Sequence, residues 1–180
     1  LSYFPAALYA SLKDSKGGGY HKLASPEYSH TDYVDATPSV FDAYLGDDGS
    51  SEWRTVLVGS LGGGGRGFFG LDVTDPSAFS EANADDIVLG EFSNADDAHL
   101  GYSYSQPRFG RMNNGRSAVI IGNGLDDTAT DESGGQAQLF IVYLDGDAPG
   151  ADGKWDLGKD YIRIATGKGS AEVGLRNGLF

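Results

Sequence analysis

The chain contains no cysteine, which excludes disulfide bonds, zinc–thiolate sites, thiol nucleophiles and redox cysteine pairs. Long apolar runs are missing too: neither end shows a signal-peptide pattern or an apolar stretch of about 18 residues. The first residue is Leu1 and the single methionine is Met112. We therefore expect an excised or processed segment of a longer protein.

Basic residues are scarce. Lysine and arginine together number 13, against 26 aspartates and glutamates, which gives a formal net charge of −13. Such a surface repels phosphate backbones and anionic lipid head groups, so we expect no nucleic-acid partner. With 180 residues, 39% of them hydrophobic, the chain is long and apolar enough to build a folded core, and disorder is not expected.

Helical periodicity is almost absent. One short helix is predicted at the N-terminus, with Pro5 at its first position and Phe4, Leu8 and Leu12 on one face. Elsewhere, short β-branched or aromatic runs alternate with Gly, Asn, Asp and Pro, which is typical of an all-β chain. The strongest of these predicted strands are residues 54–59, 67–73, 86–92, 117–122, 138–144 and 161–166.

The strand-like runs occur as two similar sets of four. The first comprises TPSVFDAY, TVLVG, FFGLDVTD and DIVLGEF, and the second QPRFGRMN, AVIIG, LFIVYLDGD and DYIRIAT. This alignment pairs Pro38 with Pro107, Gly59 with Gly122, Val73 with Leu144 and Ile87 with Tyr161. A degenerate repeat of roughly 70 residues, each a four-stranded meander, predicts blades of a β-propeller.

The predicted fold is therefore all-β: a partial β-propeller of about two four-stranded antiparallel blades with a short N-terminal helix. We divide it into a lead-in at residues 1–34, a first blade at 35–99, a second blade at 100–166 and the start of a further blade at 167–180. Two blades cannot close a ring, and stacked repeats usually need about three units for stability. The expected partner is the remainder of the propeller or a self-associated copy.

The polyglycine stretch at residues 62–65 allows two interpretations. Gly62, Gly64 and Gly67 formally match the dinucleotide fingerprint G-x-G-x-x-G after a predicted strand. That fingerprint needs a helix after its last glycine, whereas FFGLDVTDP favours a strand, and a Walker loop fails because Arg66 is followed by Gly67. The stretch is interpreted as a flexible hairpin loop.

Acidic clusters suggest metal sites only weakly. Asp145, Asp147 and Asp156 occupy positions 1, 3 and 12 of an EF-hand-like loop, but Pro149 replaces an oxygen ligand and position 12 is not Glu. A solvated hairpin is favoured there, with a weak calcium loop as the alternative. The run formed by Asp126, Asp127, Asp131 and Glu132 has no ligand spacing and is interpreted as a solvated insertion.

No catalytic, cofactor-binding or metal residue is assigned. Asp96 and Asp97 precede His99, and we favour an interblade turn in which the aspartates cap backbone amides over a metal or acid–base pair. His21 and His30 have no matching nucleophile, and no G-x-S-x-G elbow supports a hydrolase. Exposed aromatics would make an adhesive surface, although most such rings pack in cores; the candidates are Tyr3, Tyr20, Tyr28, Tyr33, Tyr44, Tyr102, Tyr104 and Phe109.

Several of these segments occur together in one family. The chain resembles the PilY family of type IV pilus tip-associated proteins in SPEYSHTDYVDATPSVFDAY, WRTVLVGSLGGGGRGFFGLDVTDP, FSNADDAHLGYSYSQP, SAVIIGNG and ATGKGSAEVGL. This resemblance implies a C-terminal β-propeller, extracellular and outer membrane-associated at the pilus tip, that supports pilus biogenesis, twitching motility and adhesion. Implied partners are minor pilins and host or abiotic surfaces. The family's calcium loop would lie beyond Phe180, so no calcium ligand is transferred to this chain.

The leading hypothesis is a non-enzymatic fragment of a pilus-tip adhesin and biogenesis factor. One alternative is a quinone-dependent dehydrogenase-like propeller, which would need a tryptophan-docking repeat and a basic, aromatic cofactor pocket. Another is a calcium-stabilised structural surface module.

Overall fold

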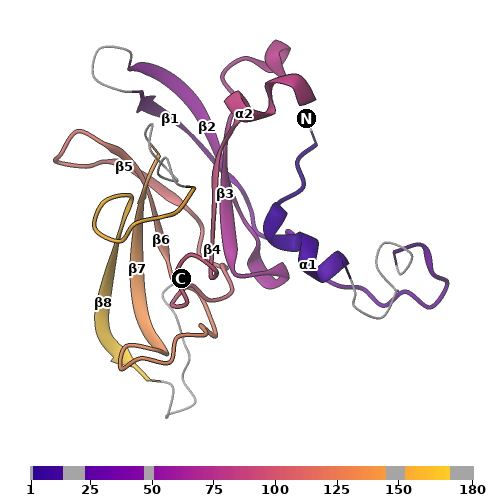
Figure 1. Cartoon of the computed structure of the whole chain (residues 1–180), viewed down its shortest axis with the longest axis vertical. Helices are drawn as coiled ribbons and strands as arrows, with labels where there is room; N and C mark the ends of the chain where they lie inside the picture. The colour runs from indigo at the N-terminus through magenta and orange to yellow at the C-terminus, as the bar shows by residue number, and fades with distance from the viewer. Residues whose placement is uncertain (1, 14–22, 47–50, 145–152, 171–180) are drawn as a thin grey trace.

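The computed structural model describes residues 2–13, 23–46, 51–144 and 153–170, and most of its regular structure is β (Figure 1). Eight strands form two four-stranded antiparallel sheets, with the orders β1-β2-β3-β4 and β5-β6-β7-β8. We call these sheets blade 1 and blade 2. The strands are β1 (Ser39–Leu45), β2 (Glu52–Ser60), β3 (Gly67–Asp72), β4 (Val88–Ser93), β5 (Arg108–Arg111), β6 (Ser117–Gly122), β7 (Gln136–Tyr143) and β8 (Tyr161–Gly169). The all-β, two-blade prediction is confirmed; the division into domains stays a prediction.

Helices are short. A 3₁₀ turn at Ala6–Leu8 continues into α1 (Tyr9–Leu12), and further 3₁₀ turns at Gly62–Gly64, Pro76–Ala78 and Glu81–Asn83 are accompanied by α2 (Ala84–Ile87). Within the described ranges, no helix has the length and apolar character needed to cross a membrane.

Two local predictions need correction. The strand expected over residues 86–92 begins only at Val88, because Asp86 and Ile87 belong to α2. At the N-terminus Leu8 and Leu12 are buried, whereas Phe4 is 41% exposed and stacks on Tyr9 with ring centroids 5.4 Å apart. From its position in α2, Ile87 packs its side chain into the hydrophobic core.

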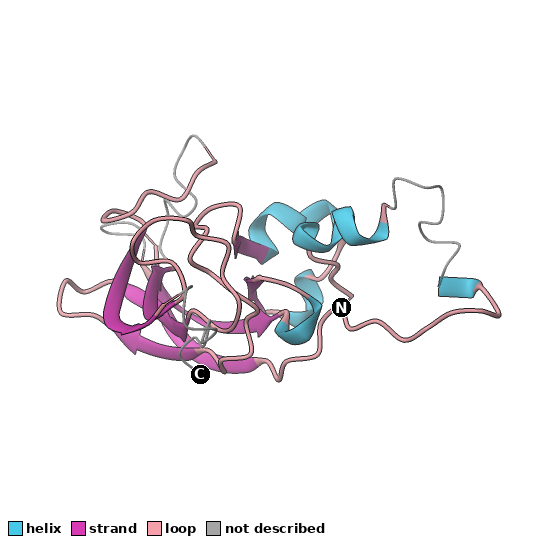
Figure 2. Ribbon diagram, turned by 90° about the horizontal axis from the view of Figure 1, so that it is seen from below, coloured by secondary structure: helices cyan, strands magenta, loops and turns pink. Residues whose placement is uncertain are grey.

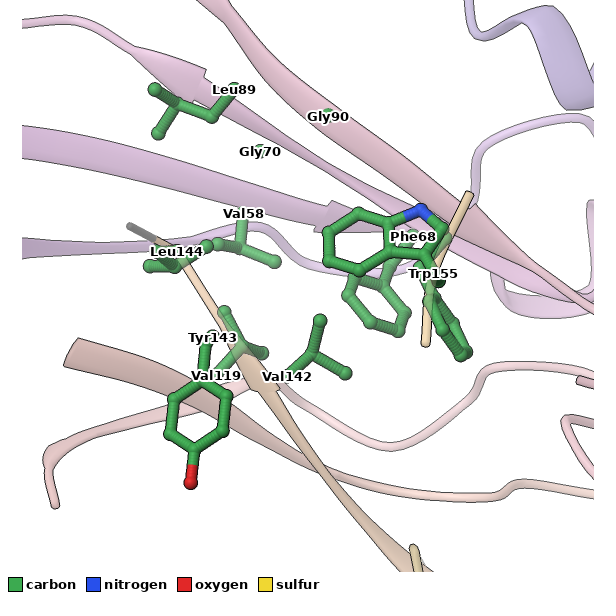
Figure 3. Close-up of a pocket in the computed structure, with 11 residues that line it drawn as sticks. Val58, Phe68, Gly70, Leu89, Gly90, Val119, Val142, Tyr143, Leu144 and Trp155 are labelled. Atoms are coloured by element: carbon green, nitrogen blue, oxygen red, sulfur yellow. The ribbon is translucent and has the colours of Figure 1, made fainter. Parts of the chain in front are cut away.

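The two blades meet face to face in a buried apolar layer, which we call the blade seam. Phe92 of β4 lies near its centre, with ring centroids 5.7 Å from Phe140, 5.4 Å from Trp155 and 4.9 Å from Tyr161. Figure 3 shows Val58 and Phe68 of blade 1 facing Val119 and Val142 of blade 2, with Trp155 beside them. The remaining cavity there is about 10 Å³, room for at most one water, so the seam is close-packed.

The opposite face of blade 1 carries a second core. Leu61, Phe69 and Leu71 are covered by Leu8 of the N-terminal segment and Ile87 of α2. Figure 2 shows the helices gathered on one side of the strands. Glu91 of β4 fixes the N-terminal segment, because its carboxylate accepts hydrogen bonds from the Tyr3 hydroxyl and from the amides of Ala6 (2.8 Å) and Ala7 (3.2 Å).

Backbone hydrogen bonds determine which residues of the two blades correspond. The Leu61 amide donates to Gly67 at the end of β2, and the Asn123 amide donates to Gln138 at the end of β6. At the other end of these strands, Val73 donates to Thr55 and Leu144 donates to Ser117 in the same way. Leu61 therefore corresponds to Asn123, and Val73 to Leu144.

This correspondence confirms part of the predicted alignment. Pairing within the sheets confirms that Pro38 corresponds to Pro107. The residue of blade 2 predicted to be equivalent to Gly59 is wrong by one position: it is Ile121, since Gly59 pairs with Phe69 and Ile121 pairs with Phe140. The predicted match of Ile87 to Tyr161 is also wrong by one, because Val88 and Tyr161 take equivalent places beside β3 and β7. A one-residue shift reverses the face to which a strand residue points, so it decides which faces of the blades correspond.

We predict that Phe92→Ala lowers the free energy of unfolding by about 3–5 kcal/mol, because it empties the centre of the seam. Urea denaturation followed by tryptophan fluorescence measures the change. The matched control is Val40→Ala in β1, whose side chain is 59% exposed and whose truncation should cost ~0.5 kcal/mol or less. Equal losses for the two variants would contradict the described seam.

Candidate functional site

The connection between the blades is fixed by hydrogen bonds along most of its length. This interblade segment, residues 94–107, leaves β4 at the outer edge of blade 1 and crosses the end of the seam to reach β5 (Figure 1). On the way the Gly101 amide donates to Asn123 (2.7 Å), and Tyr102 exchanges two backbone hydrogen bonds with Leu125 (2.6 and 3.1 Å). Further along, the Ser105 hydroxyl accepts from the Gly122 amide (3.1 Å). The middle of the crossing and the part near β5 are thus fixed to blade 2.

Two glycines allow the segment to approach the β6–β7 loop this closely. A Cβ at Gly101 would lie 2.3 Å from the carbonyl oxygen of Leu125, and one at Gly124 would lie 1.8 Å from that of Tyr102. Gly124 also has a φ of +71°, a conformation that side chains disfavour. The glycine of the motif LGYSYSQP is therefore required by the close approach of two backbone segments.

The polyglycine loop is a packed hairpin connection. It leads into β3 and not into a helix, which confirms the hairpin and excludes the dinucleotide fingerprint. The Gly63 amide donates to the Asp35 carboxylate (2.7 Å), so a protein carboxylate takes the donor that a phosphate would need. A Cβ at Gly64 would lie 1.9 Å from the Tyr33 carbonyl oxygen. Close backbone contacts therefore require these glycines, while the flexibility of the loop stays a prediction.

Arg66, at the end of this loop, connects the two blades. Its guanidinium donates to the carbonyl (2.9 Å) and the carboxylate (2.8 Å) of Asp126, and it lies over the Tyr102 ring at 4.2 Å. Asp127 is 3% exposed and accepts from the amides of Ala129 (3.3 Å) and Gly135 (2.8 Å). The prediction of a solvated insertion is therefore wrong for Asp127, which is buried. Asp126 pairs with Arg66 but its side chain is 45% exposed, and Asp131 and Glu132 are exposed as expected.

Asp97 is the centre of a polar cluster in which Asp97, His99 and Tyr161 are buried and the other members partly or largely exposed. We call it the Asp97 cluster: Asp97, His99, Asp131, Ser133, Tyr161 and Arg163. The Asp97 carboxylate accepts two hydrogen bonds from Arg163 Nη1 (2.6 and 2.9 Å) and one from the Tyr161 hydroxyl (2.8 Å). It also accepts from the His99 amide (3.0 Å), and its side chain is only 4% exposed. The cluster links the interblade segment to β8, 66 residues further along the chain.

These contacts shift the titration of the carboxylates. Burial is the largest single influence and raises the pKa of Asp97, but the donors from His99, Tyr161 and Arg163 together outweigh it, so this pKa lies below its ordinary value. Burial and then the hydrogen bond to Asp97 raise the pKa of Tyr161. Hydrogen bonds from His99 and then Ser133 lower the pKa of Asp131 to about 2. The carboxylates are therefore ionised at neutral pH and act as acceptors.

His99 bridges the two carboxylates. Its Nδ1 lies 2.9 Å from Asp97 and contacts Arg163, while its Nε2 lies 2.9 Å from Asp131 and 2.8 Å from the Ser133 hydroxyl. Every one of these polar groups faces another protein group, which suits a structural clamp.

The predicted interblade turn is confirmed. The Asp96 carboxylate accepts from the Ser93 amide (2.8 Å), and Asp97 caps the His99 amide. Arg163 and Tyr161 were not recognised from the sequence as partners of Asp97. The sequence does contain an indication of this contact. Arg163 interrupts the otherwise apolar strand YIRIAT, and a charged side chain in such a strand needs an oppositely charged or hydrogen-bonding neighbour.

The other candidate residues are dispersed. Asp145, Asp147, Tyr20 and His21 lie outside the described residues, and the calcium loop stays a prediction, with Asp156 exposed at its end. The described ranges contain no cluster of three His, Cys, Asp or Glu side chains that could hold a metal ion. His30 is exposed and pairs with Asp32 at 2.9 Å.

The aromatic candidates divide between core and surface. Tyr3, Tyr33 and Phe109 pack against the two cores. Tyr28 and Tyr104 are 40% and 49% exposed, and Tyr44 lies beside the exposed Trp53. The adhesive surface stays a prediction.

Two antiparallel four-stranded blades that share a seam, with a connection crossing its end, define a segment of a β-propeller. The chain belongs to the family of the PilY1 beta-propeller domain, whose family model matches residues 6–156. The expected relationship to the PilY proteins is therefore confirmed.

Relatives of known name agree with this assignment. A Type IV pilus biogenesis factor PilY1 homolog of Xylella fastidiosa is 48% identical over 68% of this chain, which amounts to 7% of the relative. The Type IV pilus biogenesis factor PilY1 of Pseudomonas aeruginosa is 41% identical in strain UCBPP-PA14, over 69% of this chain and 9% of the relative. In strain PAO1 it is 38% identical over 81% of this chain and 11% of the relative.

One solved structure is similar as well. The crystal structure of the Pseudomonas aeruginosa PilY1 C-terminal domain matches with a TM-score of 0.50 and 38% identity, and the match covers 62% of this chain and 20% of that one. The chain thus spans a small part of the proteins that it resembles.

We predict that Asp97→Asn lowers the free energy of unfolding by about 3–5 kcal/mol, because it leaves the Arg163 charge buried without its counter-ion. Chemical denaturation at pH 7 measures the loss. Glu132→Gln, an exposed carboxylate in the same region, is the control and should leave the denaturation midpoint unchanged. A variant as stable as wild type would contradict the role of the Asp97 cluster.

The same cluster predicts a pH dependence. Because the pKa of Asp97 is lower in the folded than in the unfolded chain, its stabilisation is complete above about pH 5 and is lost as the pH falls through the folded value. The free energy of unfolding of wild type should therefore fall between about pH 5 and about pH 2. Asp97→Asn should show a shallower fall over this range, and parallel curves for the two proteins would refute the assignment.

Proposed function

We propose that this chain forms two consecutive blades of the β-propeller of a type IV pilus biogenesis factor. In this role it is a non-enzymatic part of a protein located outside the cell, at the pilus tip and associated with the outer membrane. The observation that carries the proposal is the family match over residues 6–156, together with relatives named as pilus biogenesis factors at 38–48% identity.

The described geometry supports a binding and scaffolding role. Catalytic groups need a reacting atom within hydrogen-bond reach and a cleft to hold it. Here the Asp97, His99 and Arg163 side chains bond to each other, and the surface hollows of about 350 and 480 Å³ among the described residues lie away from them, along β2, α2 and the N-terminal segment. Such a region holds two blades rigidly and leaves their loops and edges to bind partners.

The proposed partners are the minor pilins and other tip components of the pilus, and the proposed further activity is adhesion to host or abiotic surfaces with twitching motility. An acidic chain with a net charge of −13 favours partners with a complementary basic surface. We expect no nucleic-acid ligand, for the same electrostatic reason.

Deletion of the codons for this segment from the bacterial gene tests the proposal. We expect loss of surface pili, counted by electron microscopy and by shearing pili from the cells, and loss of twitching zones. The gene with Glu132→Gln serves as the matched control and should retain both. Attachment to polystyrene, measured per surface pilus, separates adhesion from assembly. Normal piliation and attachment in the deletion strain would refute the proposal.

A further inference from the structure

Two surface hollows lie at the segment that joins β3 to β4. The first, of about 350 Å³, contains Trp53 of β2 and Asp86 of α2, and we call it the Trp53 hollow. The second, of about 480 Å³, reaches Phe4 of the N-terminal segment, and we call it the Phe4 hollow. Phe79 and Ile87 line both of them, so the two hollows adjoin.

Acidic side chains dominate the Trp53 hollow. Four carboxylates line it, against a single guanidinium. That guanidinium, of Arg54, is already bonded to two of the carboxylates, those of Glu52 at 2.8 Å and Asp72 at 3.0 Å. The other two belong to Asp75 and Asp86, which form no ion pair with any described residue. The hollow therefore keeps an excess of negative charge.

The chain around the hollows adds more negative charge. From Gly67 to Pro107 the sequence holds eight aspartates and glutamates and no lysine or arginine. One of these acidic residues, Glu81, is exposed and lines the Phe4 hollow. A surface of this one sign attracts a positively charged ligand and disfavours an anionic one.

Exposed aromatic rings border both hollows. Trp53 is 64% exposed in the first. In the second, Phe4 and Tyr9 are 41% and 55% exposed, and their rings stack with centroids 5.4 Å apart. The face of an aromatic ring attracts a cation, as a carboxylate does, so the exposed Trp53 ring and the carboxylates beside it favour the same kind of ligand.

We propose that the two hollows form a docking site for an arginine-bearing peptide segment of a partner protein. A guanidinium suits the Trp53 hollow because it stacks on an aromatic ring and donates two hydrogen bonds to one carboxylate, that of Asp75 or Asp86. An apolar side chain next to that arginine packs in the Phe4 hollow against Phe4 and Tyr9. The inference depends on the shape and charge of the hollows and not on the pilus role, which stands if this site fails its test.

A second copy of this chain does not suit the site. Each copy has a formal net charge of −13, so two copies repel each other. Several of its arginines are also held within the chain: Arg66 by Asp126, Arg163 by Asp97, and Arg116 over the Tyr143 ring. The occupant is therefore a basic segment of another protein.

The test uses the natural full-length polypeptide that contains this chain, and a fluorescein-labelled, end-capped peptide Arg-Phe-Arg-Phe as the probe. Its counterpart with citrulline in place of arginine has nearly the same shape but no charge. Fluorescence anisotropy measures both affinities at about 0.15 M salt, where the Debye length is about 8 Å and distant charges are screened.

The variants are Trp53→Ala, Asp86→Asn and the two combined. Both side chains lie outside the hydrophobic cores, so the variants should fold, and circular dichroism checks this. Glu132→Gln, which removes one exposed charge from the loop between β6 and β7, is the matched control.

We expect the double variant to bind the arginine probe at least about tenfold more weakly than wild type, and each single variant about threefold more weakly. Glu132→Gln should bind it as wild type does. Wild type should bind the citrulline probe at least about tenfold more weakly than the arginine probe.

Equal affinities of wild type and the double variant would overturn the proposal, as would equal affinities for the two probes. A loss of the same size in Glu132→Gln would overturn it too, because the probe would then respond only to overall charge. Absence of binding to the natural polypeptide would have the same consequence, since the hollows would then be covered by the protein itself.

Discussion

Packing of Phe92 against Phe140, Trp155 and Tyr161 is the contact on which the rest of the structure depends. It brings two sheets together so that non-equivalent faces meet: the Val58 side of blade 1 contacts the Ile121 side of blade 2. Sheets related in this way can be followed by a third sheet in the same relation, whereas two equivalent faces in contact would form a closed pair. The strand register, which decides the face to which each side chain points, thus determines this geometry.

Polar contacts hold the connection across the end of this apolar layer. The Asp97 cluster fixes its outer part and the Tyr102–Leu125 pairing its middle, while Arg66 joins the loops of the two blades. Buried charges are costly unless they are paired, so each of these groups specifies one arrangement of the connection.

Much of the fold was predictable from the sequence because strand runs, hairpin glycines and turn aspartates are local signals. Which face of a sheet each residue occupies was less predictable. Gly59 aligns with Gly122 by residue identity, but the backbone hydrogen bonds make it equivalent to Ile121, because residue identity does not reveal the register of a strand. The pairing of Asp97 with Arg163 joins segments 66 residues apart, which composition and spacing do not encode.

The central claim is that the Val58 face of blade 1 meets the Ile121 face of blade 2. Nuclear Overhauser spectroscopy on the isotope-labelled chain tests it most directly. The account predicts cross-peaks from the Phe92 ring to Phe140 and Tyr161, and from the Phe41 ring to Phe109, whose centroids lie 4.4 Å apart. Cross-peaks from Phe69 to Phe140, without those of Phe92, would place the other face of blade 1 in the seam and contradict it.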